Sequence, residues 1–78
     1  PSVYDIVRDA FNYYGIKVLM LKIVDIKNNT FIGRLYLQQG KKIIALDCRP
    51  SDGTAIALRT SAKIYIKKSL AEKIGHYI

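Results

Sequence analysis

The sequence predicts one small α+β domain, an antiparallel sheet with helices in the order α-β-β-β-α-β-α. The chain has only 78 residues, the size of a single domain. Its apolar residues recur at helical spacing in some segments and form β-rich runs in others. No linker, internal repeat or low-complexity segment divides it, so residues 1–78 are taken as one domain.

The first predicted element is a capped amphipathic helix. Ser2 is followed three residues later by Asp5, which is the spacing of a capping box. Gly15 ends a run of apolar residues that recur at helical spacing, namely Val3, Ile6, Val7, Ala10, Phe11 and Tyr14.

Three antiparallel strands are predicted to follow. The segment Lys17–Lys27 is nearly all Val, Leu, Met or Ile, a composition that suits a strand covered on both faces. Two further β-rich runs are Thr30–Gln38 and Lys41–Cys48. The pairs Asn28-Asn29 and Gln39-Gly40 are expected to form the two tight turns between them.

A second helix is predicted after Pro50, over residues Ser51 to Thr60, with Ser51 or Asp52 as the cap of its first turn. Gly53 lies within this helix, and glycine weakens a helix by roughly 1 kcal/mol relative to alanine.

The last two predicted elements are short. Lys63–Lys67 alternates Lys, Ile, Tyr, Ile and Lys, as a strand does. Ser69-Leu70-Ala71-Glu72 has the capping-box pattern, which predicts a final helix that runs to about Gly75.

Two-residue turns fix a register, and the alternation of side chains then assigns each residue to a face of the sheet. The face expected to form the core carries Val18, Met20, Val24, Ile26, Phe31, Leu35, Leu37, Ile44 and Leu46. The other face carries Leu19, Leu21, Ile23, Ile32, Tyr36, Ile43 and Ala45, interrupted by Asp25, Arg34 and Asp47. Because this second face is too apolar for solvent, either helices cover both sides or the chain forms a homo-oligomer.

The composition restricts the setting and the partners. Thirteen Lys and Arg against six Asp and Glu give a net charge of +7, which is compatible with nucleic acid as a partner. The single cysteine, Cys48, cannot form an intramolecular disulfide and is expected to be a small core residue. No apolar stretch is long enough to span a membrane. Because a chain with a single cysteine suits a reducing compartment, we expect a cytoplasmic protein.

The strongest candidates for chemistry lie in the strand-to-helix junction. Asp47 and Asp52 are candidate metal ligands for Mg²⁺ or Mn²⁺, and Arg49 and Ser51 lie between them. Such a metal polarises a phosphodiester or activates water, while an arginine or a helix N-terminus stabilises the added negative charge.

A simpler interpretation of the same residues is purely structural. In the predicted register Asp25 and Asp47 flank Ile32, and Arg34 lies diagonal to both, so the three charges can form an ion-pair network. Ser51 and Asp52 can be no more than helix-capping residues.

The remaining polar residues have two interpretations as well. The basic ones are either ordinary solvated charges or a surface that follows phosphates, with Tyr13, Tyr14, Tyr36 or Tyr65 available for base stacking: Lys22, Lys41, Lys42, Lys63, Lys67, Lys68 and Lys73. His76 has no acidic, Ser or Cys neighbour at motif spacing and is expected to be a solvated tail residue.

The run Asp47-Cys48-Arg49-Pro50-Ser51-Asp52 resembles the hallmark stretch of the bifunctional nuclease family. The resemblance continues through Ala55–Arg59 and Ala62–Ile66, and it extends back to the opening segment Pro1–Tyr14 and the Asp25–Arg34 hairpin. Two residues depart from the family pattern: Tyr4 stands where a histidine is expected, and Gly53 where an alanine is usual.

This resemblance implies a nuclease that acts on DNA and RNA and is often oligomeric. It also implies that further strands precede the first helix in the family, so that this chain corresponds to the C-terminal part of the domain. The hypothesis is metal-assisted phosphodiester hydrolysis with Asp47, Arg49, Ser51 and Asp52 in the site. The alternative is a non-catalytic module for nucleic-acid binding or oligomerisation.

Overall fold

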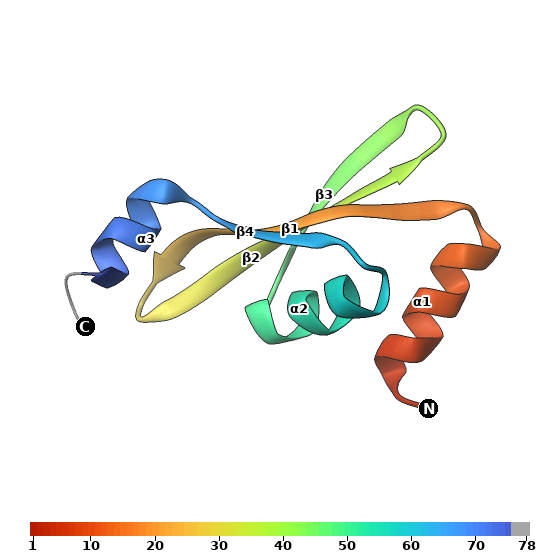
Figure 1. Cartoon of the computed structure of the whole chain (residues 1–78), viewed down its shortest axis with the longest axis horizontal. Helices are drawn as coiled ribbons and strands as arrows, with labels where there is room; N and C mark the ends of the chain where they lie inside the picture. The colour runs from red at the N-terminus through yellow and green to blue at the C-terminus, as the bar shows by residue number, and fades with distance from the viewer. Residues whose placement is uncertain (76–78) are drawn as a thin grey trace.

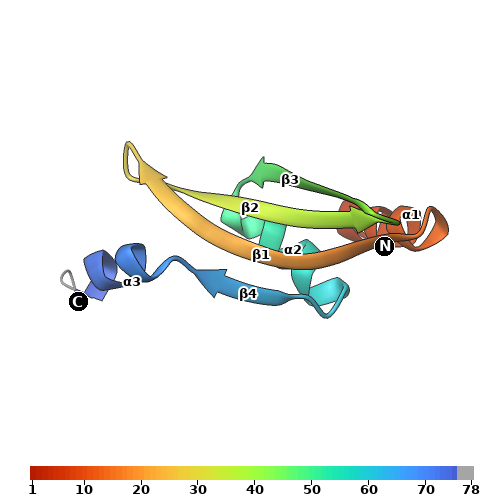
Figure 2. The ribbon, with the colours of Figure 1, turned by 90° about the horizontal axis from the view of Figure 1, so that it is seen from above.

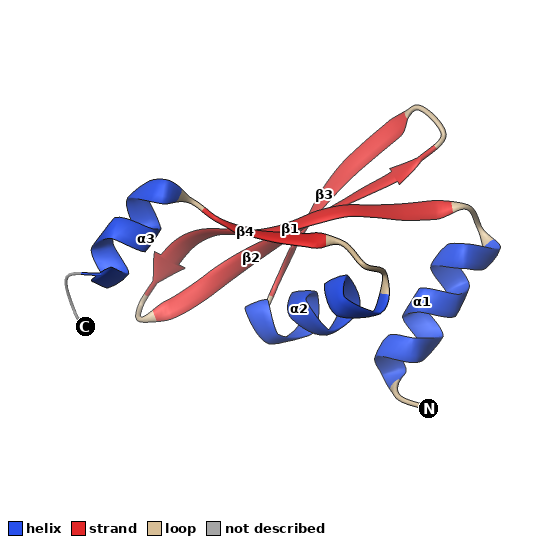
Figure 3. Cartoon of the chain, in the orientation of Figure 1, coloured by secondary structure: helices blue, strands red, loops and turns tan. Residues whose placement is uncertain are grey.

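A computed structural model of the chain describes residues 1–75, so His76 lies outside the described residues. The α+β class and the order of elements are confirmed (Figures 1 and 3). The elements are α1 (Val3–Tyr13), β1 (Ile16–Lys27), β2 (Thr30–Gln39), β3 (Lys42–Cys48), α2 (Pro50–Arg59), β4 (Lys63–Ile66) and α3 (Lys68–Gly75). None of the helices in residues 1–75 has the length and apolar character that a membrane crossing requires.

The four strands form one sheet in the order β3-β2-β1-β4. The pairs β1–β2 and β2–β3 are antiparallel, as predicted. The fourth strand was expected in an antiparallel sheet, but it pairs parallel with β1. The reason is that α2 returns the chain from the end of β3, and a helical crossover of this kind brings the next strand back in the same direction.

The turn between β2 and β3 lies one residue later than predicted. Gln39 pairs with Lys42, so the loop consists of Gly40 and Lys41 instead of Gln39 and Gly40. Gly40 has a φ of +58°, a conformation that glycine adopts at little cost, and it therefore takes the first loop position. The change moves each β3 residue two places along β2 and leaves the faces unchanged.

Two irregularities in β1 change which side chains face the core. The register shifts between Val18 and Met20 and again between Ile23 and Asp25. An extra residue in one strand reverses the side-chain alternation beyond it. Leu21 and Ile23, which were predicted on the second face, therefore pack in the core, and Leu21 is fully buried.

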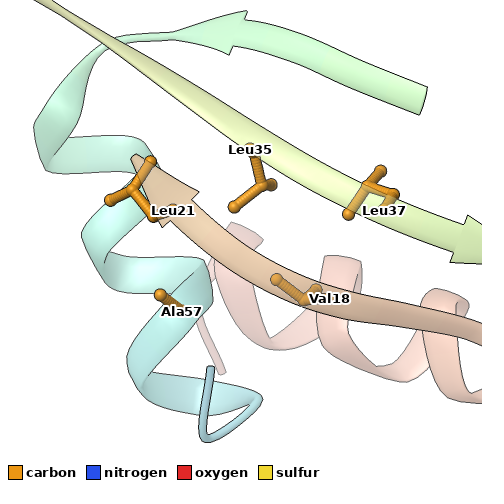
Figure 4. Close-up of a cluster of buried hydrophobic side chains, with 5 residues drawn as sticks. All are labelled: Val18, Leu21, Leu35, Leu37 and Ala57. Atoms are coloured by element: carbon orange, nitrogen blue, oxygen red, sulfur yellow. The ribbon is translucent and has the colours of Figure 1, made fainter. Parts of the chain in front are cut away.

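The buried core consists of Val18, Leu21, Leu35 and Leu37 from the sheet and Ala57 from α2 (Figure 4). Phe11 of α1 and Cys48 of β3 pack against it, which confirms the structural role predicted for Cys48. Three predicted core residues are exposed instead, namely Phe31, Ile44 and Leu46, and a fourth, Met20, lies on the other face because the register shifts between it and Val18. Edge strand β3 extends beyond the area that the helices cover, so its residues Lys42 to Asp47 are all exposed.

The helices α1 and α2 lie on the same side of the sheet, below the strands in Figure 1 and behind them in Figure 2. The prediction left open whether helices cover both sides. Among residues 1–75, the central part of the other face has no helix over it, and side chains such as Tyr65 remain 46% exposed there.

The helix termini differ in how closely they follow the predictions. In α1 the capping box is formed: the Ser2 hydroxyl accepts from the backbone N–H of Asp5, and the Asp5 carboxylate accepts from that of Ser2. In α3 the Lys67 carbonyl accepts the first helical hydrogen bonds, so Ser69 lies inside the first turn and is not the cap.

Gly53 is one of the two buried residues of α2 and packs closely against the sheet. A Cβ atom at this position would lie 2.6 Å from Cδ1 of Leu21 and 2.9 Å from Sγ of Cys48. The glycine therefore has a packing role as well, because the side chain of Leu21 occupies the space that a Cβ atom at position 53 would need.

We predict that Gly53→Ala destabilises the protein. The substitution should gain about 1 kcal/mol in helix propensity, but overpacking a core typically costs about 1–3 kcal/mol. Urea denaturation should therefore show a net loss of about 1 kcal/mol. Ser51→Ala is the matched control, since Ser51 is exposed in the same helical turn and surface changes usually stay within about 0.5 kcal/mol. A higher urea midpoint for Gly53→Ala than for the parent chain would contradict the packing argument.

Candidate functional site

Between the end of β3 and the first turn of α2, the chain passes from one side of the sheet to the other within a few residues. Cys48 ends β3 with its side chain toward the core, and Arg49 follows in an extended conformation with φ −68° and ψ 140°. Pro50 then occupies the first turn of α2, where its fixed φ and missing N–H suit a helix start. Arg49 is the N-cap residue and makes no side-chain capping bond, so the prediction of Ser51 or Asp52 as the cap is wrong.

Asp52 is the centre of a small polar cluster between α1 and α2. Its Oδ1 accepts a 2.6 Å hydrogen bond from the hydroxyl of Tyr4, and its Oδ2 accepts a 2.9 Å bond from Nε of Arg49. The bond from Tyr4 and then the bond and charge of Arg49 lower the pKa of Asp52. The same contact raises the pKa of Tyr4, so near neutral pH the cluster consists of an ionised carboxylate and a neutral phenol.

Arg49 presents its guanidinium to solvent from this cluster. The side chain is 78% exposed, while its Nε is bonded to Asp52. Arginine carries five N–H donors in a planar fork, so one bond to Asp52 fixes the group and leaves other donors directed outward. A fixed, exposed guanidinium of this kind suits a phosphate oxygen.

A second group of contacts joins α1 to the C-terminal end of α2. Nε of Arg59 donates a 2.8 Å bond to Oδ1 of Asp5, and its Nη2 lies 3.3 Å from the hydroxyl of Ser2. Nη1 of Arg59 donates to the carbonyl of Ala55, and the guanidinium lies 5.3 Å from the centre of the Tyr4 ring. These contacts hold Tyr4 beside α2, where it reaches Asp52.

Asp47 lies apart from this cluster. Side chains alternate along β3, so Asp47 points to the opposite face from Cys48 and from the helices. It pairs across the strands with Arg34 and not with Ile32 as predicted, and Nε of Arg34 lies 3.0 Å from its Oδ1. Asp25 instead accepts a hydrogen bond from the neighbouring backbone N–H of Ile26. The predicted network of three charges is therefore reduced to the ion pair between Arg34 and Asp47.

The structure thus brings Arg49 and Asp52 together, keeps Ser51 in the same first turn of α2, and places Asp47 on the other face of the sheet. Ser51 is exposed in the first turn of α2. Within residues 1–75 no three His, Cys, Asp or Glu side chains gather closely enough to hold a metal ion. Because Asp47 and Asp52 face opposite sides of the sheet, each offers a metal only one carboxylate.

Three residues of these two groups of contacts were not proposed from the sequence as site residues: Tyr4, Asp5 and Arg59. Asp5 was predicted only as part of a capping box, which it also forms. Tyr4 is 48 residues from Asp52, and Asp5 is 54 residues from Arg59. No local sequence pattern predicts contacts between residues so far apart in the chain. The one available signal was Tyr4 itself, which stands where the family pattern has a histidine.

A cleft of about 560 Å³ lies between α1 and the segment that joins α2 to β4. Four of its lining residues are basic, namely Arg8, Lys17, Arg59 and Lys63. None of the four predicted site residues lines it. It shares only Arg59 with the contacts described above.

Comparison with known proteins gives a consistent family. The family model described as the bifunctional nuclease domain matches residues 1–78. An uncharacterized protein of Mycobacterium tuberculosis is 33% identical over 75 residues, which cover 96% of this chain and 44% of that protein. Bifunctional nuclease 2 of Arabidopsis thaliana is 31% identical, and bifunctional nuclease 1 of Oryza sativa subsp. indica is 28% identical, each over 78 residues.

In each of these two plant proteins the match covers 96% of this chain and 24% of the relative. The chain therefore spans less than half the length of the curated relatives it matches. The expectation that it is the C-terminal part of the family domain is not confirmed by the match over residues 1–78.

We predict that Asp5 contributes to stability in a defined acid range. The hydrogen bond from the Ser2 backbone, followed by the bond from Arg59, lowers the pKa of Asp5 from 3.8 to about 2. A lowered folded-state pKa stabilises the protein above the unfolded value, and the contribution is lost as the pH falls from 3.8 toward about 2. In acid titrations of the unfolding free energy, Asp5→Asn should flatten the decline within this window.

Asp9→Asn is the matched control for this titration, because Asp9 lies on the same helix and its side chain is 69% exposed. It should keep the parent slope. Equal slopes for Asp5→Asn and the parent chain would show that the contacts of Asp5 do not stabilise the fold.

Proposed function

Because this chain belongs to the bifunctional nuclease domain family, we propose that it takes part in hydrolysis of phosphodiester bonds in DNA or RNA, assisted by Mg²⁺ or Mn²⁺. The observation that carries the proposal is the exposed guanidinium of Arg49, fixed by an ionised Asp52 at the start of α2. The net charge of +7 favours a polyanionic substrate.

Arg49 is the proposed phosphate clamp. A phosphodiester gains negative charge as it is attacked, and a positioned arginine stabilises that charge. The helix dipole adds a partial positive charge at the same place, because α2 begins at Pro50. Ser51, exposed in this first turn, offers a hydroxyl to the same phosphate.

Asp52 is the proposed carboxylate for the metal, because Asp47 lies on the opposite side of the sheet and is paired with Arg34. Mg²⁺ is usually held by one or two carboxylates together with substrate phosphates. When bound, the metal would polarise the phosphodiester or activate water. Asp52 also has a role of its own, since it holds both Arg49 and Tyr4 in place.

A non-catalytic nucleic-acid-binding module is the second candidate. It is favoured by the separation of Asp47 and Asp52 onto different sides of the sheet, which leaves one carboxylate per side for a metal. For both candidates we propose a cytoplasmic location. The free cysteine Cys48 suits a reducing compartment of this kind.

The test is cleavage of single-stranded DNA and RNA by the purified chain, with Mg²⁺, with Mn²⁺ and with a chelator. We expect metal-dependent cleavage that falls roughly 100-fold in Arg49→Ala, the scale of losing one group that stabilises developing charge. Asp52→Asn should lower the rate as well, because Arg49 loses the ionised partner that fixes it.

Asp9→Asn serves again as the control variant and should cleave like the parent chain. Binding without cleavage would support the non-catalytic module. Cleavage that is unchanged in both Arg49→Ala and Asp52→Asn would refute this site, and circular dichroism of each variant separates loss of activity from loss of fold.

We also propose that the chain forms a homo-oligomer through the exposed edge strand β3. Ile43, Ile44 and Leu46 are 56%, 46% and 48% exposed, and the outer edge of this strand has no neighbour within residues 1–75. An apolar edge strand with unpaired backbone groups is a template for pairing with another copy.

Light scattering at micromolar concentration should therefore give a mass of at least two chains. Ile44→Lys should shift the protein toward the monomer, because two charged edges would face one another. A monomeric mass for the parent chain at this concentration would exclude the oligomer.

A further inference from the structure

The sheet face opposite α1 and α2 carries a regular array of side chains. Figure 2 looks down on this face and shows α2 behind β1 and β2. The strand pairings align its residues in two rows that cross the sheet from β4 to β3: Tyr65, Lys22, Arg34 and Asp47 in one, and Lys63, Met20, Tyr36 and Ala45 in the other. We call these eight residues the open face.

The open face carries two tyrosines, Tyr36 and Tyr65, and three basic residues, Lys22, Arg34 and Lys63. Residues directly opposite one another on paired strands point to the same side, so Tyr65 lies beside Lys22, and Lys63 beside Met20. Tyr65 is 46% exposed, Lys63 is exposed, and Tyr36 and Lys22 are half-buried. A shallow depression in the surface is lined by Met20, Lys22 and Tyr65, together with Ile66, Lys67 and Lys68.

The charge of the open face is positive. Its one carboxylate, Asp47, is already paired with Arg34. Lys22 lies directly opposite Arg34, so two cations stand side by side with one carboxylate, Asp47, bonded to the arginine. Among residues 1–75 every salt bridge uses an arginine, so Lys22 and Lys63 bring charges that no carboxylate balances.

We propose that the open face binds single-stranded nucleic acid, with bases stacked on Tyr36 and Tyr65 and phosphates contacted by Lys22, Arg34 and Lys63. The inference rests on the proposed function for the choice of nucleic acid as the ligand. It adds which surface binds the nucleic acid and that the bound form is single-stranded. Four strands span about 14 Å at the usual spacing, and a sheet of this size can stack two or three bases on its aromatic residues.

Single strands fit this surface better than duplexes. Stacking on tyrosine requires the face of a base, which is hidden inside a double helix. The row of Tyr65, Lys22 and Arg34 also ends at Asp47, the residue that opens the strand-to-helix junction. A single strand along this row would therefore lead toward Arg49.

A second copy of the chain is a weaker candidate for this face. Each copy would bring the same cations to the interface, and like charges juxtaposed across an interface are costly. The edge of β3, which is apolar, is the part of the sheet better suited to self-association.

The test is fluorescence anisotropy with a labelled oligothymidylate in the presence of chelator, so that binding is measured without cleavage. Tyr65→Ala should weaken binding roughly 5- to 150-fold, which corresponds to the loss of one stacked base at ~1–3 kcal/mol. Tyr65→Phe retains the ring and should bind like the parent chain. Lys22→Ala should lower the slope of log K against log salt by about 0.7, the value for one phosphate contact on a single strand.

Tyr13→Ala is the matched control. Tyr13 is 84% exposed but lies at the end of α1, where it packs edge-on against Tyr14 and is not on the open face. Its loss should leave binding unchanged. If Tyr13→Ala weakens binding while Tyr65→Ala does not, or if the parent chain prefers duplex, the inference is overturned.

Two further results separate this inference from the proposed function. If binding depends on Tyr65 but no cleavage occurs, the proposed binding role of the open face stands and the nuclease proposal is refuted. If cleavage depends on Arg49 but binding is unchanged by substitution of Tyr65 or Lys22, the nuclease proposal stands and the binding role of the open face is refuted. A dimer that dissociates in Tyr65→Ala, with no oligothymidylate bound by the parent chain, would assign the face to a second copy and overturn the inference.

Discussion

The close packing of Gly53 against Leu21 and Cys48 is the constraint that lets α2 lie on the sheet. Because position 53 has no Cβ, α2 can lie directly on the sheet and close over Leu21, the fully buried side chain of the core. That placement sets the first turn of α2 beside α1, where Asp52 meets Tyr4. In a domain this small the core has little surplus stability, so one tight contact has consequences for the functional residues.

The sheet separates two kinds of surface. On its helical side, polar contacts between α1 and α2 fix Asp52 and Arg49 around Tyr4. Its open side carries two tyrosines and three basic residues, and no helix among residues 1–75 covers its central part. The short segment from Asp47 to Asp52 passes from the open side to the helical side, so the junction is where a ligand on one surface would meet groups from the other.

Arginines and lysines divide the positive charge between two roles. All four arginines pair with aspartates in the structure, and the pairs of Arg34 and Arg59 join separate elements. Arginine is suited to this because its planar fork forms directed bonds. The lysines form no salt bridge among residues 1–75, so no carboxylate balances their charge.

The sequence by itself determined the class, the order of the elements and the capped start of α1, because apolar periodicity and capping patterns are local properties of the chain. It also identified the junction around Arg49 and Asp52. Only the tertiary structure decided the parallel pairing of β4, the inward side of Leu21 and the contacts of Tyr4 and Arg59. Irregularities within β1 reverse the side-chain alternation, and contacts between residues about fifty positions apart depend on how α1 and α2 pack, which no short pattern encodes.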